Sequence, residues 1–425
     1  MKTSKFKMTE VGPIPEDWEV KRLGEVGEPL MCKRILKSQT SDSGDIPFYK
    51  IGTFGKTADA FISRELFASF KRQYSYPHYG DVLISAAGTI GRTVVFDGHD
   101  AYFQDSNIVW IGHDEHVVLN KYLKWYLDII KWQTENGGIV TRLYNDNLRN
   151  SLIVFPPLPE QEKIADALSD VDALLSAMST LIEKKRNIKT GAMQELLGMR
   201  NAEFGMRNVP RRRLAGFSGE WVEKRLGDCG TAIRGVSYKP YQAFYESGAG
   251  RTMLLRSNNI QDNVLTFDDV VYVSEECIGD EQYMRCGDVL ICAANGSRNL
   301  VGKSAVLKTM DQTVTFGAFM AIFRANSDIE AGFAGYLLQT ESYRQQLDDI
   351  LTGSAINNLN SKDILDLAFA VPPTLAEQKA IAAVLSDMDA EIAALEAKRA
   401  KYECIKQGMM QELLTGKTRL KGEWK

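Results

Sequence analysis

Two groups of basic, amide and aromatic side chains are the residues of this sequence whose types could do binding chemistry. Arg and Lys suit phosphates and guanine, Asn suits adenine, and aromatic rings pack against sugars. Loops also carry such residues for solvation alone, and that interpretation stays open. The candidate DNA contacts are Lys71, Arg72, Tyr74, Arg92, Arg142, Tyr144 and Asn145 in the first half of the chain, and Tyr238, Lys239, Arg256, Asn258, Asn295, Arg298, Asn299, Lys303, Asn357 and Asn358 in the second half.

The patterns that would indicate catalysis fail on spacing or context. Five residues separate Gly296 from Gly302-Lys303-Ser304, whereas a phosphate loop has four there and leads into a helix. His113 and His116 flank a polar turn, which favours a solvated loop over a metal pair. The sequence has no Gly-x-Ser-x-Gly elbow, no Asn-Pro-Pro-aromatic methyltransferase loop and no dinucleotide fingerprint after a strand. It therefore predicts a binding protein without a catalytic or metal site.

Length and charge limit how such binding could work. The 425 residues, enough for about three domains, carry 51 Lys and Arg against 55 Asp and Glu, a formal charge of -4. Any nucleic-acid site must therefore be a local patch. The polar N-terminus and the lack of an apolar run of about 18 residues predict a soluble cytoplasmic protein. The six cysteines form no CxxC pair and are expected to be reduced thiols.

The elements that must position these side chains are best seen by comparing the chain with itself. Trp18 and Trp221 each precede a Lys-Arg-Leu-Gly, and the segment Gly-Asp-Val-Leu-Ile occurs at 80–84 and again at 287–291. Each copy is followed by a glycine-bearing loop and a β-branched run, which predicts strand, loop and strand. Such a repeat predicts an α+β fold with two similar globular αβ modules.

A long helix is predicted after each module, beyond Pro156-Pro157 and Pro372-Pro373. Apolar residues from Ile164 to Ile182 step by 4, 3, 4, 3 and 4 residues, and Ile381 to Leu395 repeat the pattern. An average step of 3.5 indicates a coiled-coil seam, so the two helices are expected to pair antiparallel. The alternative is that each helix packs only on its own module.

The domain boundaries follow from these patterns, and the C-terminus repeats part of the start of the second module. Arg419-Leu420 and the Gly-Glu-Trp at 422–424 match Arg213-Leu214 and 219–221. This predicts a circular repeat with pseudo-twofold symmetry and neighbouring termini. The predicted segments are a first domain over 1–156, helix 157–198, linker 199–218, a second domain over 219–372, helix 373–416 and a tail over 417–425.

The two helices carry matched polar residues 217 positions apart. We expect these residues to lie on an outward edge of each helix, and two copies of one edge suggest two copies of one partner. The candidate docking residues are Glu160, Gln161, Asp170 and Glu195 on the first helix and Glu377, Gln378, Asp387 and Glu412 on the second.

Taken together, nearly the whole chain resembles the specificity subunit of type I restriction-modification systems. The resemblance is carried by the two Trp and Lys-Arg-Leu-Gly module starts, the two Gly-Asp-Val-Leu-Ile segments, and the two Pro-Pro/Glu-Gln helices that end in Met-Gln-Glu-Leu-Leu. It implies two target-recognition domains, each reading one half of a split double-stranded DNA sequence. It also implies that the paired helices set the spacing and dock two methyltransferase subunits, through which restriction and translocase subunits join.

The resemblance further implies that this chain is not itself an enzyme and binds no cofactor. S-adenosylmethionine, ATP and Mg are expected on partner subunits, which would flip and methylate an adenine in each half-site. One departure is the start of the second helix, Pro372-Pro373-Thr374, which is one residue longer than in the first. The main alternative is a two-headed scaffold that binds no DNA, ahead of a stand-alone methyltransferase or nuclease.

A short duplication lies between the first helix and the second module, where Gly-Met-Arg-Asn at 198–201 recurs at 205–208. The segment is either a loop, as its glycines favour, or partly helical. If it is helical, its seven residues add roughly 10 Å of reach, about three base pairs. Deleting 198–204 is then expected to shorten the unspecified spacer of the methylated DNA target and to leave both half-sites unchanged. Methylation of the original spacing at full efficiency would show that the linker is slack.

Overall fold

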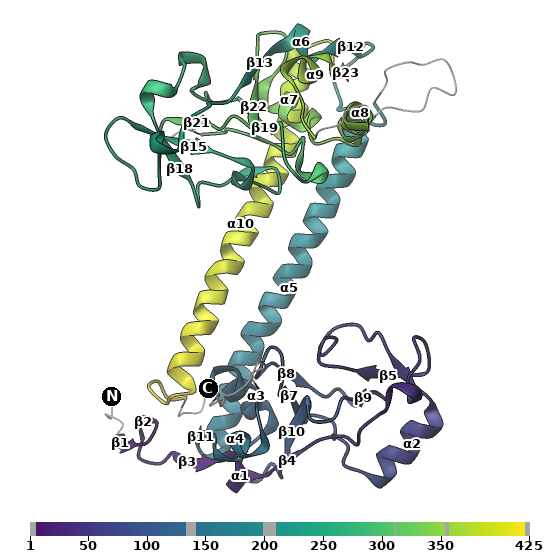
Figure 1. The fold of residues 1–425 in the computed structure, drawn as a ribbon, viewed down its shortest axis with the longest axis vertical. Coiled ribbons are helices and arrows are strands. Elements are labelled where there is room, and N and C mark those ends of the chain that lie inside the picture. The colour runs from purple at the N-terminus through teal and green to yellow at the C-terminus, as the bar shows by residue number, and fades with distance from the viewer. Residues whose placement is uncertain (1–5, 133–141, 199–209, 310–311, 353–356, 421–425) are drawn as a thin grey trace. The chain divides into compact units, whose positions relative to one another are not determined.

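The structure is a computed structural model that describes residues 6–132, 142–198, 210–309, 312–352 and 357–420 (Figure 1). The duplicated linker segment at 199–209 therefore lies outside the described residues. The chain divides into two compact units, one of residues 1–179 and 397–425 and the other of 180–396. Both boundaries fall inside long helices, so each unit contains parts of both. Among the described helices, none is long and apolar enough to cross a membrane.

The first unit is built on a four-stranded antiparallel sheet in the order β4-β10-β7-β8. Alternate residues of its strands enter different cores, because successive side chains of a strand point to opposite faces. Val82 and Ile84 pack in one core with Trp18, while Leu83 packs in the other with Trp110. The strands are β4 (Glu28–Leu30), β7 (Val82–Ser85), β8 (Thr93–Val95) and β10 (Ile108–Gly112).

A smaller sheet, β6-β5-β9, closes the second of these cores, and β5 pairs parallel with β9. Helix α2 begins after Ser63, whose hydroxyl accepts a hydrogen bond from the Leu66 N–H as an N-cap. The remaining elements of this unit are β1 (Phe6–Thr9), β2 (Gly12–Pro15), β3 (Glu19–Arg22), α1 (Leu23–Val26), β5 (Ile46–Tyr49), β6 (Phe61–Ile62), α2 (Arg64–Gln73), β9 (Tyr102–Phe103), α3 (Asn120–Ile129), α4 (Asn145–Asn150) and β11 (Leu152–Phe155).

The second unit repeats this architecture, which confirms the internal repeat. Its main sheet has the order β13-β22-β19-β20, and the second sheet, β14-β18-β15-β21, again contains one parallel pair, β15 with β21. The elements are β12 (Val222–Arg225), α6 (Leu226–Cys229), β13 (Gly230–Arg234), β14 (Ala243–Phe244), β15 (Arg251–Leu255), β16 (Ile260–Gln261), β17 (Val264–Leu265), β18 (Val271–Ser274), β19 (Val289–Cys292), β20 (Ser304–Val306), β21 (Val314–Phe316), β22 (Met320–Ala325), α7 (Ala331–Leu337), α8 (Glu341–Thr352), α9 (Ser361–Asp366) and β23 (Ala368–Val371).

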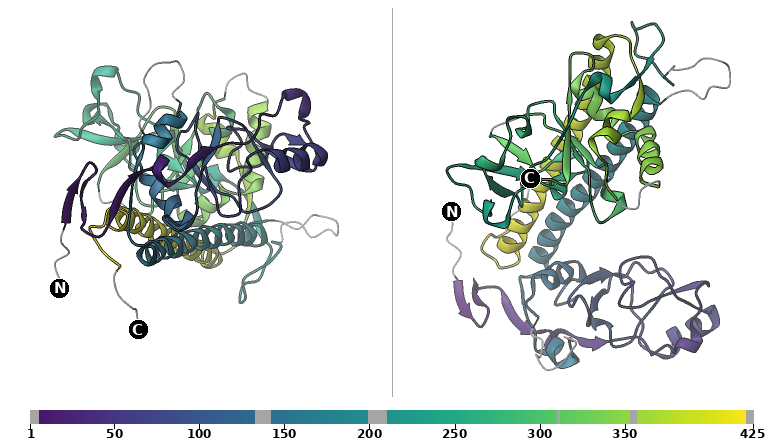
Figure 2. Two further views of the ribbon diagram at one scale, coloured as in Figure 1. Left: turned by 90° about the horizontal axis from the view of Figure 1, so that it is seen from below. Right: turned by 45° about the horizontal axis from the view of Figure 1, so that its top comes forward.

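The long helices α5 (Leu158–Leu197) and α10 (Leu375–Leu413) lie side by side in both views (Figures 1 and 2). In the first unit, the Lys406 ammonium contacts the Asp172 carboxylate at 2.5 Å. In the second unit, Lys189 contacts Asp389 at the same distance. Because positions near the start of one helix pair with positions near the end of the other, the helices are antiparallel, as predicted.

The predicted coiled-coil seam describes one part of these helices, and packing of a helix on its own module, the alternative, describes another part. Leu175, Met178 and Ile182 are buried as the 3.5-residue step requires. Ile164 and Leu168 belong to the core of the first unit, so the first turns do pack on their own module. Asp172 and Asp389 form the ion pairs between the helices, so the contact of α5 with α10 contains paired charges as well as apolar residues.

The start of each long helix is fixed by a buried carboxylate. Glu160 of α5 accepts hydrogen bonds from Trp18 Nε1 at 3.2 Å and Arg419 Nε at 2.7 Å. In the second unit, the carboxylate is that of Glu377, and its donors are Trp221 Nε1 at 3.3 Å and Arg213 Nε at 2.9 Å. Arg419 thus occupies the place that Arg213 has in the second unit, which confirms the circular repeat.

The glutamine that follows each carboxylate is also buried and binds backbone. The Gln161 amide donates to Val117 O and Pro156 O, and its oxygen accepts from Leu119 N–H. Gln378 donates to Pro372 O and accepts from the N–H of Glu330. The prediction that Glu160, Gln161, Glu377 and Gln378 lie on an outward docking edge is therefore wrong, because all four are at most 6% exposed and attach each helix to its own domain.

The extra residue at the second helix start also has a role. Thr374 Oγ1 accepts a hydrogen bond from the N–H of Glu377 at 3.3 Å, and its carbonyl accepts from Gln378 N–H. In α5 the corresponding N–H groups of Glu160 and Gln161 bond to the carbonyl of Pro157. The longer start is thus accommodated by a threonine that bonds the first turn.

We predict that Arg419→Met destabilises the first unit by about 3–5 kcal/mol, because it leaves the Glu160 carboxylate, 6% exposed, without its cation. The free energy of unfolding from urea titrations followed by circular dichroism is the measurement. Adding Glu160→Gln should recover most of the loss. Arg64→Met is the matched control, since its partner Asp100 is 43% exposed, and it should cost less than about 1 kcal/mol. Equal losses for the two arginines would contradict the prediction.

Candidate nucleic-acid interface

A cleft of about 960 Å³ in the second unit brings together six of the candidate DNA contacts. Its walls come from the segments that follow β13, β15 and β19, the turn between β21 and β22, and the stretch before α9. Its lining contains two arginines, Arg234 and Arg256, and no acidic residue. The candidates that line it are Tyr238, Arg256, Asn258, Asn295, Asn357 and Asn358.

Two of the side-chain amides in this cleft form hydrogen bonds with the loops around them. Asn295 Nδ2 donates to Ser257 Oγ at 3.4 Å, and its Oδ1 accepts the N–H of Ser297. Asn357 Nδ2 donates to Gly296 O at 3.3 Å. Asn358 Oδ1 is buried without a hydrogen-bond partner. Because buried polar atoms are normally satisfied, this oxygen marks acceptor capacity that a bound group could use.

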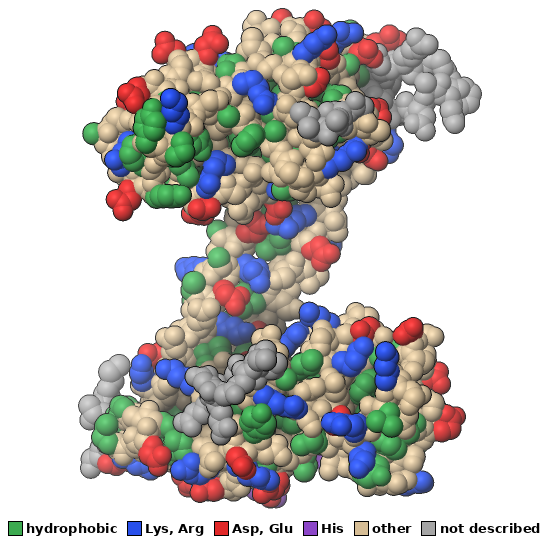
Figure 3. All heavy atoms as spheres, in the orientation of Figure 1, with side chains coloured by type: hydrophobic (Ala, Val, Ile, Leu, Met, Phe, Trp, Pro, Cys, Tyr) green, Lys and Arg blue, Asp and Glu red, His purple; other side chains and the backbone are tan. Residues whose placement is uncertain are grey.

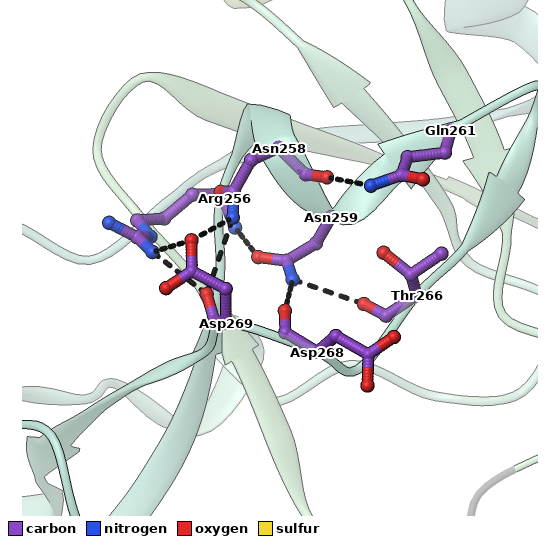
Figure 4. Close-up of polar contacts among 7 residues, drawn as sticks. All are labelled: Arg256, Asn258, Asn259, Gln261, Thr266, Asp268 and Asp269. Carbon is purple, nitrogen blue, oxygen red and sulfur yellow. Dashed lines mark hydrogen bonds and ion pairs between the residues drawn. The ribbon is translucent and has the colours of Figure 1, made fainter. Parts of the chain in front are cut away.

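The two arginines differ in how they are held. Arg234 donates to Leu359 O at 2.7 Å, and burial lowers the pKa of its guanidinium below its ordinary value. Arg256 bonds Asp269 through Nη2, whereas its Nε is buried without a partner. The Nε–H of Arg256 is therefore a donor that a group bound in the cleft could use, while Figure 4 shows Nη2 paired with Asp269.

Three of the other candidates in the second unit face elsewhere. Lys239 lies over the ring of Tyr241, 6.0 Å from its centroid. Arg298 donates to Thr352 Oγ1 in α8, and Lys303 donates to Ile260 O. Together with the exposed Asn299, these residues are absent from the cleft lining, and their contact with DNA stays a prediction.

The first unit has a smaller cleft, of about 500 Å³, at the corresponding place in its fold. Arg142 lines it and forms a β-bridge with Ala87, as Asn358 does with Ala294 in the second unit. Arg142 Nη2 donates to Ser106 O at 2.7 Å. The candidates from the sequence did not include the other basic lining residues, two of which follow β4 and one of which follows β5; a position after a strand could have indicated them. They are Arg34, Lys37 and Lys50, and the acidic lining residues are Asp42, Asp59 and Asp105.

The remaining candidates of the first unit lie outside this cleft. Lys71 contacts Asp100 at 3.4 Å and lies over the ring of Tyr76. Arg92 donates to Gly55 O, while Arg72 and Tyr74 are exposed at the end of α2. Tyr144 and Asn145 lie at the start of α4. DNA contact by these six residues stays a prediction.

Among the described residues, no broad basic face is visible on the side of the molecule drawn in Figure 3. On the surface in view, Lys and Arg are interspersed with Asp and Glu on each unit (Figure 3). This agrees with the formal charge of -4, which allows only local basic patches.

The helix residues expected to dock a partner divide into two sets. Asp170, Glu195, Asp387 and Glu412 are exposed, and the Glu412 carboxylate accepts a hydrogen bond from the hydroxyl of Thr418. The other four are the buried residues described above. A docking edge, where there is one, must therefore be built on the exposed set.

No group of three or more His, Cys, Asp or Glu that could hold a metal lies in the described part of the chain. Both ring nitrogens of His113 lie 3.0 Å from backbone carbonyls, those of Ile111 and Val118, so this ring is held by the protein backbone. Burial raises the pKa of the Cys32 thiol to about 12 and keeps it protonated.

Comparison with known proteins places this arrangement in a family. The family model for the type I restriction modification DNA specificity domain matches residues 15–187 and again 219–403. A putative type I restriction enzyme specificity subunit of Haemophilus influenzae is 58% identical over 166 residues, which are 39% of this chain and 43% of that protein. A type I restriction enzyme specificity subunit of Methanocaldococcus jannaschii is 24% identical over 99% of this chain and 97% of its own length.

The fold has solved relatives as well. The crystal structure of the S subunit of a type I restriction-modification system from M. genitalium aligns with a TM-score of 0.60 over 97% of this chain and 98% of that chain, at 14% identity. With two matches of the family model, this chain belongs to the type I restriction modification DNA specificity family, whose members are non-catalytic DNA-recognition subunits.

Proposed function

We propose that this chain reads a two-part, asymmetric DNA target, with one half recognised in each unit. The observation that carries the proposal is the pair of clefts at corresponding places of two repeated units in a chain of this family. Basic residues outnumber acidic ones in both linings, four to three in the first and two to none in the second. In the first lining Arg34 pairs with Asp105 and Lys50 with Asp59, so the excess of basic residues is clearer in the lining of the second unit.

The chemistry of the two linings differs and supports unlike half-sites. The second cleft offers the amides of Asn258, Asn295 and Asn357, and an amide both donates and accepts, as the edge of adenine requires. The first offers Arg34, Lys50 and Arg142, which only donate and suit guanine or phosphate. The base sequence read also depends on the shape of the DNA.

In this proposal, the paired helices hold the spacing and dock two methyltransferase subunits, through which restriction and translocase subunits join. The exposed residues Asp170 and Asp387, which correspond in the repeat, would lie in the two docking surfaces. Methyl transfer to adenine, with S-adenosylmethionine, ATP and Mg, would belong to the partners. This chain would contribute register on the duplex and no reacting group.

Asn295→Asp is predicted to change recognition in one half-site only. The substitution keeps the oxygen that accepts the Ser297 N–H but removes the amide nitrogen, which donates to Ser257 Oγ in the cleft lining. Loss of one base contact should cost about 1–3 kcal/mol at that half-site, while the other unit is untouched. Sequencing of methylated adenines in cells that carry the variant with its partners measures this.

Asn326→Asp is the matched control, because it makes the same charge change in an exposed residue outside the cleft lining, whose oxygen likewise accepts the N–H two residues on, that of Asp328. It should leave the methylated sequences unchanged. Altered recognition in both halves by Asn295→Asp, or in neither, would contradict the assignment of this cleft.

A second prediction concerns the helices. Lys at both Asp170 and Asp387 should weaken association with the methyltransferase subunits, and native mass spectrometry should show loss of the two-to-one assembly. The fold should be unaffected, since exposed charges contribute little to stability. Glu183→Lys, exposed on a different side of α5 at 3.6 residues per turn, is the control and should assemble normally. Full assembly of the double variant would exclude this edge as the docking surface.

A further inference from the structure

One acidic residue outside the second cleft contacts two residues that line it. Arg256 Nη2 donates to the carbonyl oxygen of Asp269 at 2.8 Å and lies 3.5 Å from its Oδ2. Asn258 Nδ2 donates to the same carboxylate oxygen at 3.0 Å and to the same carbonyl at 3.2 Å. Figure 4 shows both side chains converging on Asp269. A single residue therefore anchors two candidate DNA contacts.

The segment that leads to Asp269 is held by a buried side chain, that of Asn259. Asn259, which is fully buried and directly follows Asn258 in sequence, donates through Nδ2 to Thr266 O and Asp268 O, and its Oδ1 accepts the N–H of Arg256 (Figure 4). These hydrogen bonds hold together the two ends of the segment that connects β15 to β18. Asp269 itself has a φ of +48°, a left-handed conformation that Asn, Asp and Gly tolerate best.

The anchoring limits the freedom of both side chains. A free arginine has many rotamers, and fixing one on binding costs entropy that an already oriented side chain avoids. The carboxylate also fixes which way the Asn258 amide points, because its nitrogen must face Asp269. Finally, a paired guanidinium attracts phosphates less than a free one does, so the pairing opposes binding to DNA of any sequence.

The strength of the contact between Arg256 and Asp269 depends on whether a ligand is bound. The Asp269 side chain is 86% exposed and that of Arg256 37%, so water screens the pair in the free chain. A bound duplex would exclude that water and strengthen the contact, because charges interact more strongly where the dielectric is low.

We infer that Asp269 is a positioning residue that sets the specificity of the second unit by orienting Arg256 and Asn258 toward base edges, without touching DNA itself. The inference rests on the proposed function. It predicts a distinct result: removal of the carboxylate should weaken binding to the matched sequence and at the same time strengthen binding to unrelated sequences.

The test uses Asp269→Asn in the full chain assembled with its methyltransferase subunits. Asparagine keeps the left-handed backbone accessible and removes the charge. The probes are a duplex that carries the target established by methylated-adenine sequencing, its single-base-pair variants, and a scrambled duplex of equal length. The matched control is Asp262→Asn, because Asp262 is 84% exposed, also has a positive φ, and lies outside the cleft lining.

For Asp269→Asn we expect matched binding to weaken by about threefold to tenfold, and discrimination to fall at one or two base pairs of a single half-site. Binding to the scrambled duplex should tighten, and its log–log salt slope should steepen by about 0.9, as one freed cation gains a phosphate. Asp262→Asn should change none of these values.

Unchanged discrimination at every base pair would overturn the inference. So would a uniform loss of binding to matched and scrambled duplexes with an unchanged salt slope, which indicates only a damaged loop. Failure of the proposed function would differ from both, because the unsubstituted assembly would then show no preference for any duplex.

Discussion

The buried carboxylate at the start of each long helix is the contact on which the rest of the architecture depends. A carboxylate taken out of water needs a paired cation and further hydrogen bonds. Glu160 and Glu377 obtain both from a tryptophan at the start of the module and an arginine from a distant part of the chain. The arginine of each unit determines how the two helices must pair. Arg213 follows the end of α5 but binds the start of α10, and Arg419 follows the end of α10 but binds the start of α5. Each unit can therefore be completed only when the end of one helix lies beside the start of the other.

A second contact repeats farther along the helices with a different aromatic partner. Lys406 pairs with Asp172 and lies over the ring of Trp125, whereas Lys189 pairs with Asp389 and lies over the ring of Tyr336. The Tyr336 hydroxyl also donates to Asp389 at 2.7 Å, and burial raises the pKa of that hydroxyl, so it stays protonated. Both units thus have a lysine–aspartate ion pair between the helices, whereas the aromatic ring beside the lysine is a tryptophan in the first unit and a tyrosine in the second.

Much of this frame, which consists of the two repeated units and the paired long helices, could be predicted from the sequence. A repeat and a 3.5-residue step are visible without knowledge of contacts. The roles of Glu160, Gln161 and their counterparts could not. Periodicity reports which side of a helix is apolar, and a polar residue is then assigned to solvent. In the first turns of α5 and α10, the domain itself covers the other side, so a polar residue becomes buried and finds its partner more than a hundred positions away. The residues that line the two clefts could be predicted only in part, for a similar reason. The amides of the second cleft stand out in its loops, but Arg34, Lys37 and Lys50 meet Arg142 only through the sheet order.

In the described part of the chain, the contacts that hold the long helices to the domains use none of the residues that line the two clefts, so the clefts could vary without disturbing those contacts. Arg142 and Asn358 occupy the same bridge position in their units, yet one is a cation that only donates and the other an amide that also accepts. Neither side chain takes part in the contacts that hold the helices to the domains. A change at such a position alters the groups offered to a ligand at little cost to the frame, since distant sites with no shared partners contribute nearly independently to stability. Under the proposed function, each half-site could then change by substitution in one cleft, while the spacing, held by the helices, stays as it is.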